Sequence, residues 1–147
     1  MDEERVARLR RVIGRLARQL NATSTEEGLT PTQASVLGLV AVRGPLGLAE
    51  LAELEGLNPT MLSRIVRKLD EVGLIRRLTD PSDLRAARVE ITSSGTVVHE
   101  RVRAQRTQVV SACLEELPAE QSDELMRALP ALESLADQLH ATGHART

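Results

Sequence analysis

The stretch LAELAELEGLNPTMLSRIVRKLDEVGLIRR, residues 48–77, decides the fold of this chain. Residues 49–55 have the composition of a short helix that ends at Gly56. Asn58, which precedes a proline, is a good N-cap for a second helix, and Gly73 ends that helix. Two helices of about 8 and about 15 residues, joined by Gly-Leu-Asn, predict a helix-turn-helix.

The second of these helices has apolar residues at helical spacing, and a stripe of this kind packs against a core. We expect the stripe to consist of Met61, Leu62, Ile65, Val66 and Leu69. The opposite face of the helix then stays available for a partner.

A β-hairpin is predicted directly after the second helix. Residues 74–78 and 87–92 are β-like, and the second segment alternates apolar with charged residues, as a half-buried strand does. Residues 80–83, Asp-Pro-Ser-Asp, have strong turn chemistry. Arg85 and Arg88 belong to this polar turn region. A hairpin in this position makes the helix-turn-helix a winged one.

Helices are also predicted on the N-terminal side. Residues 3–22 form an amphipathic helix with arginines on its polar faces. Thr30, followed by a proline and by Gln33, starts another helix with a capping box, and Gly44 stops it. Residues 46–48 are one short strand or an extended link.

On the C-terminal side, Thr92 caps a long helix over residues 93–116, which Pro118 breaks. One last helix then carries leucines at spacings of 4, 3, 3 and 4: Leu125, Leu129, Leu132, Leu135 and Leu139.

The chain has the usual size of one domain, residues 1–147. The apolar faces of residues 1–22 and 93–140 exceed what a winged lobe over residues 30–92 is able to cover. We expect these outer helices to be dimerisation helices in a symmetric homodimer. The predicted fold class is therefore mainly α, a three-helix core with a small β wing and N- and C-terminal dimerisation helices.

The composition excludes several classes of function. The chain is 41% hydrophobic and 27% charged, which favours a packed core over a disordered tail. It contains no Phe, Tyr or Trp, whereas binders of single-stranded nucleic acid stack bases on aromatic rings. Such modules are poor candidates, and any ligand pocket has to be aliphatic.

Charge is distributed unevenly although the net charge is only −2. Residues 1–20 have a net charge of +3 and residues 58–92 a net charge of +2, whereas residues 112–140 have a net charge of −6. This pattern indicates a molecule that meets a polyanion with one face only.

The sequence lacks the signals of other locations and of catalysis. No apolar run approaches the about 18 residues of a membrane span, and the N-terminus is charged from its second residue, unlike a secretory signal. We expect a cytoplasmic protein, which also fits a single cysteine. There is no Gly-rich phosphate loop, nucleophile elbow or HExxH pattern, so we expect neither an enzyme nor a cofactor.

With these elements in order, the chain resembles the MarR family of winged helix-turn-helix regulators, from about Val6 to Leu139. The resemblance is most specific in residues 48–92, where DPSDLRAARVEITSSG matches the family's wing. The wing's Asp-x-Arg pair corresponds to Asp83 and Arg85. The sequence departs from the family's pattern at Leu84, where an arginine is common, and in having no aromatic residue for an effector pocket.

The first turns of the second helix are expected to contact base edges in a major groove. The candidate DNA-binding residues there are Asn58, Thr60, Met61, Ser63, Arg64 and Arg67. An arginine contacting guanine through two hydrogen bonds discriminates by about 1–3 kcal/mol. The alternatives are a solvated helix face and, for Met61, a core position.

The wing supplies the remaining candidate DNA contacts. The resemblance implies that Arg85 enters the minor groove and that Asp83 orients it. Arg88 is expected to meet a phosphate. The alternative is an exposed ion pair without function. Of Arg76 and Arg77, one is expected to reach phosphate and the other to pair within the protein.

A cysteine and three histidines invite other interpretations. Cys113 lies on the apolar side of the long helix, so we expect a small core residue that reacts poorly rather than an oxidant sensor. His140 and His144 have a metal-like spacing, but Gly143 is expected to interrupt that helix. His99 is expected to be exposed. We therefore expect no metal site.

These observations predict a homodimer that binds double-stranded DNA at a pseudo-palindromic operator, as a regulator and most simply a repressor. The resemblance implies that a small apolar or amphipathic effector binds between the dimer helices and the winged domains and changes their spacing. The effector-binding residues are unknown. The rival prediction is a winged helix that binds protein without specific DNA binding; the Asp83 and Arg85 pair argues against it.

Overall fold

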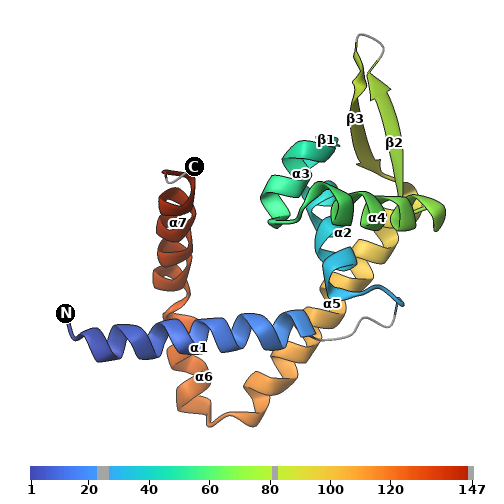
Figure 1. Cartoon of the computed structure of the whole chain (residues 1–147). Helices are drawn as coiled ribbons and strands as arrows, with labels where there is room; N and C mark the ends of the chain where they lie inside the picture. Colours follow the sequence, from blue (N-terminus) through green and yellow to red (C-terminus); the bar gives the residue numbers. More distant parts are fainter. Residues whose placement is uncertain (23–26, 81–82, 146–147) are drawn as a thin grey trace. The chain divides into compact units, whose positions relative to one another are not determined.

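The computed structural model describes residues 1–22, 27–80 and 83–145, with the backbone alone at residues 80, 83–86 and 144–145 (Figure 1). The elements are, in order, α1 (Glu3–Ala22), α2 (Pro31–Arg43), β1 (Leu46–Gly47), α3 (Leu48–Glu55), α4 (Pro59–Glu71), β2 (Ile75–Asp80), β3 (Asp83–Ile91), α5 (Ser93–Glu116), α6 (Ala119–Arg127) and α7 (Leu129–Ala145). The chain forms two compact units, Met1–Arg106 and Thr107–Thr147. None of the helices within the described ranges is both long and apolar enough to cross a membrane.

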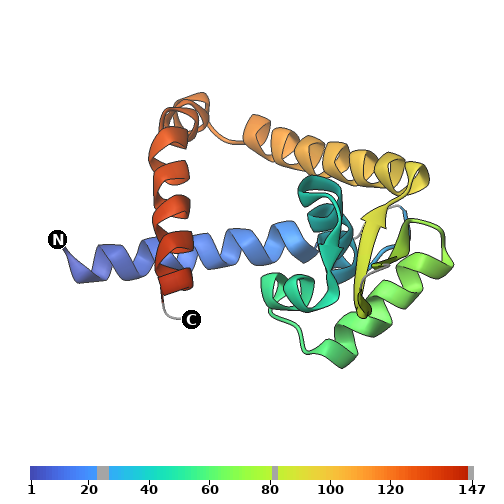
Figure 2. The same ribbon diagram turned by 90° about the horizontal axis from the view of Figure 1, so that it is seen from above.

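The helices α2, α3 and α4 form a small core that is closed by a three-stranded antiparallel sheet. The sheet has the order β1-β3-β2, and α4 lies beside β2 (Figure 2). Buried side chains come from all six of these elements: Val36, Leu37, Val40, Leu46, Leu51, Ala52, Leu62, Val66, Leu69, Ile75 and Val89, with Leu74 just before β2. The predicted mainly helical winged helix-turn-helix is confirmed.

Local signals in the sequence explain where the core helices begin and end. The Thr30 hydroxyl accepts a hydrogen bond from the Gln33 N–H, and the Gln33 side chain accepts one from the Thr30 N–H, which completes the predicted capping box. At the end of α4, the Gly73 N–H donates to Asp70 and the Leu74 N–H donates to Leu69. This pattern requires the positive φ of Gly73, 76°.

One member of the predicted apolar stripe of α4 is not part of the core. Leu62, Val66 and Leu69 are buried, but Met61 is 49% exposed. Consecutive helical residues differ by about 100° in direction, so the residue before a buried leucine points to the side. Met61 therefore belongs to the exposed face of α4.

The hairpin is longer than the sequence predicted. β3 begins at Asp83, which pairs with Asp80, so Arg85 lies on a strand and not on the turn; Arg88 lies on the strand, within the predicted strand 87–92. Residues 87–91 pair with β2 in one register, and after an irregularity between Thr79 and Asp80 the next pair is Asp80 with Asp83. The strands extend away from α2, α3 and α4 (Figure 1). The predicted turn residues 81 and 82 lie outside the described residues.

The single C-terminal helix predicted from leucine spacing is wrong, because the structure has two helices, α6 and α7. Pro130 lacks the N–H that a continuous helix would need, and its ring would clash with the preceding turn. Ala128 ends α6, and Pro130 occupies the second position of α7, where a proline is tolerated. Gly143 does not interrupt α7, which continues to Ala145.

Candidate nucleic-acid interface

The exposed face of α4 collects the polar residues that the sequence singled out. Asn58, Thr60, Met61, Arg64 and Arg67 are exposed, and Ser63 is half-buried. The opposite face of the same helix is held in the core, which fixes the direction of this surface. The structure thus places Asn58 at the start of α4 and the other five candidates on the helix itself.

Asn58 has a structural role that the prediction did not separate from DNA contact. Its side-chain oxygen accepts a hydrogen bond of 2.8 Å from the Met61 N–H. This bond satisfies one of the N–H groups that a helix start leaves without a partner. The amide NH₂ of Asn58 remains able to donate to a phosphate.

The charge of α4 favours an anion at its first two-thirds. Arg64 and Arg67 are exposed, whereas the acidic residues Asp70 and Glu71 are confined to the last turn of the helix, which also holds Lys68. The partial positive charge of a helix N-terminus acts in the same direction. Within the described part of the chain, neither Arg64 nor Arg67 forms an ion pair.

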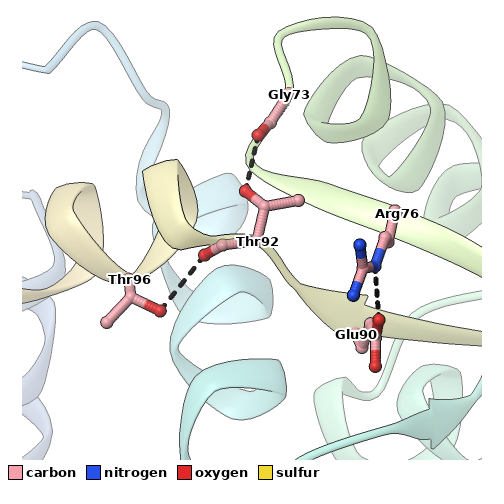
Figure 3. A network of polar contacts seen from close by, with 5 residues as sticks. All are labelled: Gly73, Arg76, Glu90, Thr92 and Thr96. Atoms are coloured by element: carbon pink, nitrogen blue, oxygen red, sulfur yellow. Dashed lines mark hydrogen bonds and ion pairs between the residues drawn. The ribbon is translucent and has the colours of Figure 1, made fainter.

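The register of the hairpin decides between the two arginines of β2. Arg76 is opposite Glu90 and forms an ion pair with it (Figure 3). Arg77 is opposite the buried Val89 and is itself exposed, with no ion pair to the described side chains. Arg76 is therefore the arginine that pairs within the protein, and a phosphate contact by Arg77 stays a prediction.

The predicted wing contacts differ in how they are placed. Arg88 is exposed on β3, opposite Gly47 and Leu78, and its guanidinium donates a hydrogen bond of 3.0 Å to the Pro45 carbonyl. A phosphate contact by Arg88 stays a prediction. The side chains of Asp83 and Arg85 lie outside the described residues; only their backbone, on β3, is described.

The cysteine and histidines are placed differently from the predictions. Cys113 is exposed in the single chain and is not a core residue of it, because α5 buries only Gly95 and Val102. His99 is half-buried beside Gly38 of α2 and is not an exposed residue. The described residues contain no group of three or more metal-binding side chains.

A small hollow lies between the end of α1 and the start of α2. Its cavity volume is about 210 Å³, and its lining includes Asn21, Ser35 and Glu55. Small-molecule sites enclose about 300–1,000 Å³ and are mostly apolar. This hollow is too small and too polar for the aliphatic pocket that the composition predicts.

A helix-turn-helix with a buried inner face on α4, an exposed cationic outer face and a hairpin directly behind it defines a winged helix-turn-helix protein. Residues 29–87 match the model of the MarR family. The matched segment runs from the residue before the capping box of α2 into β3. Over this segment the chain is similar to the MarR family, and it is also similar to a curated HTH-type transcriptional regulator.

Individual proteins show the same likeness. An HTH-type transcriptional regulator of Mycobacterium leprae is 27% identical over 124 residues, covering 84% of this chain and 87% of the relative. The HTH-type transcriptional repressor MdtR of Bacillus subtilis is 28% identical over 96 residues, covering 65% of this chain and 62% of the repressor.

Solved structures share the fold. A MarR family protein from Bacillus stearothermophilus has a TM-score of 0.74 at 23% identity, covering 93% of this chain and 99% of that chain. A mutant of MepR from S. aureus, in a structure bound to an oligodeoxyribonucleotide, has a TM-score of 0.63 at 21% identity, covering 89% of this chain and 97% of that chain.

Proposed function

We propose that the chain is a homodimeric repressor that binds a pseudo-palindromic operator in double-stranded DNA. The observation that carries this proposal is the exposed face of α4, where Arg64 and Arg67 are exposed and form no ion pair with described side chains. A helix held in this way presents its first turns to a major groove. The repressor MdtR and the DNA-bound MepR, both similar to this chain, support the same function.

The apolar faces of the outer helices support a homodimer. α1 has no buried residue in the single chain, and its apolar residues at helical spacing are 42–57% exposed: Val6, Leu9, Val12, Leu16 and Leu20. On α6 and α7 the exposed large apolar residues include Leu125, Met126, Leu129, Leu132 and Leu139. A monomer rarely leaves so much apolar surface in water, and a two-fold partner covers identical faces at once.

Leu16→Glu is expected to weaken self-association at least about tenfold, because it places a charge in an apolar interface. Sedimentation velocity at several concentrations measures this change. Val42→Glu is the matched control, since Val42 is 78% exposed on α2 and lies outside the proposed dimer helices. A dimer that persists equally in both variants would contradict the assignment of α1 to the interface.

Arg85→Ala is expected to weaken DNA binding at least about tenfold and to leave thermal unfolding unchanged, because the proposed contact of this arginine is with the minor groove and not with the core. Fluorescence anisotropy with a labelled duplex measures the affinity. Arg127→Ala on α6 removes the same charge from an exposed helix and serves as the control. Equal affinities for both variants would refute the wing assignment.

We also propose that a small apolar or amphipathic ligand releases the protein from DNA. The aliphatic composition supports this class of ligand, and a coupling of about 1–3 kcal/mol is sufficient for a switch. This proposal is tested by measuring DNA affinity in the presence of each member of a panel of apolar weak acids. If no member of a broad panel changes the affinity, the ligand part of the proposal fails while DNA binding stands.

Selection from a random duplex library tests the main proposal. We expect enrichment of a pseudo-palindrome whose half-sites lie about one helical turn apart, since two α4 helices related by a two-fold axis read the same sequence twice. Enrichment of no sequence would favour the rival function, a winged helix that binds protein.

A further inference from the structure

Thr92 connects three elements at one point, between the end of β3 and the start of α5. Its hydroxyl donates a hydrogen bond of 2.6 Å to the Gly73 carbonyl at the end of α4 (Figure 3). The same hydroxyl accepts one of 3.0 Å from the Gly95 N–H in α5. Its backbone N–H donates to the Leu74 carbonyl at 3.1 Å. Thr92 therefore forms hydrogen bonds to Gly73 at the end of α4, to Leu74 just before β2 and to Gly95 in α5.

The first turn of α5 packs closely against the backbone that follows α4. A Cβ atom on Gly95 would lie 2.0 Å from the Leu74 carbonyl oxygen, so the first turn of α5 lies directly against that carbonyl. The same Leu74 and the preceding Gly73 form the hydrogen bonds that terminate α4. Gly73 and Leu74 thus use their N–H groups to terminate α4 and their carbonyls to accept hydrogen bonds from Thr92.

We propose that Thr92 is a positioning residue for DNA recognition, one that fixes the direction of α4 relative to α5. This inference rests on the proposed binding of a homodimer to two half-sites. In such a dimer the distance between the two α4 helices determines which spacing of half-sites is accepted. If α4 is held in one orientation on α5, the distance between the two α4 helices has one value. If the connection is lost, that distance varies.

Three variants separate this role from simple helix capping. Thr92→Val keeps the β-branched shape and removes both hydroxyl bonds. Thr92→Ser keeps the hydroxyl and is the rescuing variant. Thr96→Val is the matched control, because the Thr96 hydroxyl donates only to the Thr92 carbonyl within the same segment, at 3.1 Å, among the contacts described.

Amide hydrogen exchange of the free protein tests the connection without DNA. In Thr92→Val we expect exchange to become at least about tenfold faster both at Gly95 and at Gly73 and Leu74, which lie on the other side of the connection. Thr92→Ser and Thr96→Val are expected to resemble the wild type at Gly73 and Leu74. A change at Gly95 alone would mean that Thr92 only caps α5, and would overturn the proposal.

Duplexes with altered half-site spacing test the functional consequence. One added base pair moves a half-site by about 3.4 Å and about a tenth of a turn. We expect the wild type, Thr92→Ser and Thr96→Val to prefer the selected spacing at least about tenfold, and Thr92→Val to prefer it less than about threefold. A Thr92→Val protein that is folded and still prefers the selected half-site spacing as strongly as the wild type would overturn the proposal.

The failure of this inference is distinct from failure of the proposed function. A wild-type protein that binds no duplex specifically refutes the proposed function and removes the positioning role with it. Specific binding by the wild type with unchanged spacing preference in Thr92→Val refutes only the role of Thr92.

Discussion

Gly95→Ala is expected to destabilise the protein by at least about 3 kcal/mol, a large part of the about 5–15 kcal/mol that stabilises a typical domain. The new Cβ atom would lie 2.0 Å from the Leu74 carbonyl oxygen and 2.7 Å from Cγ1 of Ile91. The isoleucine side chain is able to move, but the Leu74 carbonyl is held by the backbone: it accepts a hydrogen bond from the Thr92 N–H, and the Leu74 N–H donates to the Leu69 carbonyl at the end of α4. Thermal and urea unfolding measure the change.

The sign of this effect is opposite to that given by helix propensity. Gly95 lies within α5, where alanine is favoured over glycine by about 1 kcal/mol. Steric overlap with a fixed backbone atom outweighs that preference. Gly47→Ala is the matched control, because no atom lies within 4 Å of its Cβ position, and it should change stability by less than about 1 kcal/mol. A Gly95→Ala protein as stable as Gly47→Ala would contradict the described packing of α5 on Leu74.

Arg64→Ala is expected to weaken binding to the selected operator by about 10- to 100-fold, because a guanine contact through two hydrogen bonds discriminates by about 1–3 kcal/mol. Binding to a duplex of unrelated sequence should weaken less than about threefold, since one of several cations is lost there. Arg64 is exposed and forms no ion pair with the described side chains, so unfolding should be unaffected.

Competition titrations with both duplexes separate base reading from general electrostatics. Arg127→Ala, which removes an exposed arginine from α6, is expected to match the wild type on both duplexes. Equal losses on operator and unrelated DNA would reduce Arg64 to a phosphate contact. No loss on either would remove α4 from the interface.

Local signals explain why much of the fold was predictable. The starts of α2 and α4 are determined by residues within one turn of them, namely Thr30 with Gln33 and Asn58 with its proline. The break at Pro130 was also local, but the regular spacing of leucines on both sides of it suggested a single helix.

Features that depend on distant residues were not predictable. The glycine at position 95 is required because Leu74, 21 positions earlier, occupies the space of its side chain. The choice between Arg76 and Arg77 depends on the register that places Glu90 opposite Arg76. The exposure of Cys113 follows from the absence of a described neighbour that covers this part of α5 in the single chain. The periodicity of apolar residues predicts which face of a helix or strand is apolar. It does not predict which other element packs against that face.

The most direct measurement is binding to a labelled duplex from the DNA immediately upstream of this protein's own gene, because regulators of this kind often control themselves. It requires excess nonspecific competitor, a salt series and Arg85→Ala in parallel. We expect binding that resists competitor, is lost in Arg85→Ala and falls steeply with salt, by about 10³–10⁵ between 50 and 200 mM for 6–10 phosphate contacts. Absence of binding by the wild type at low salt would contradict the account and favour a winged helix that binds protein.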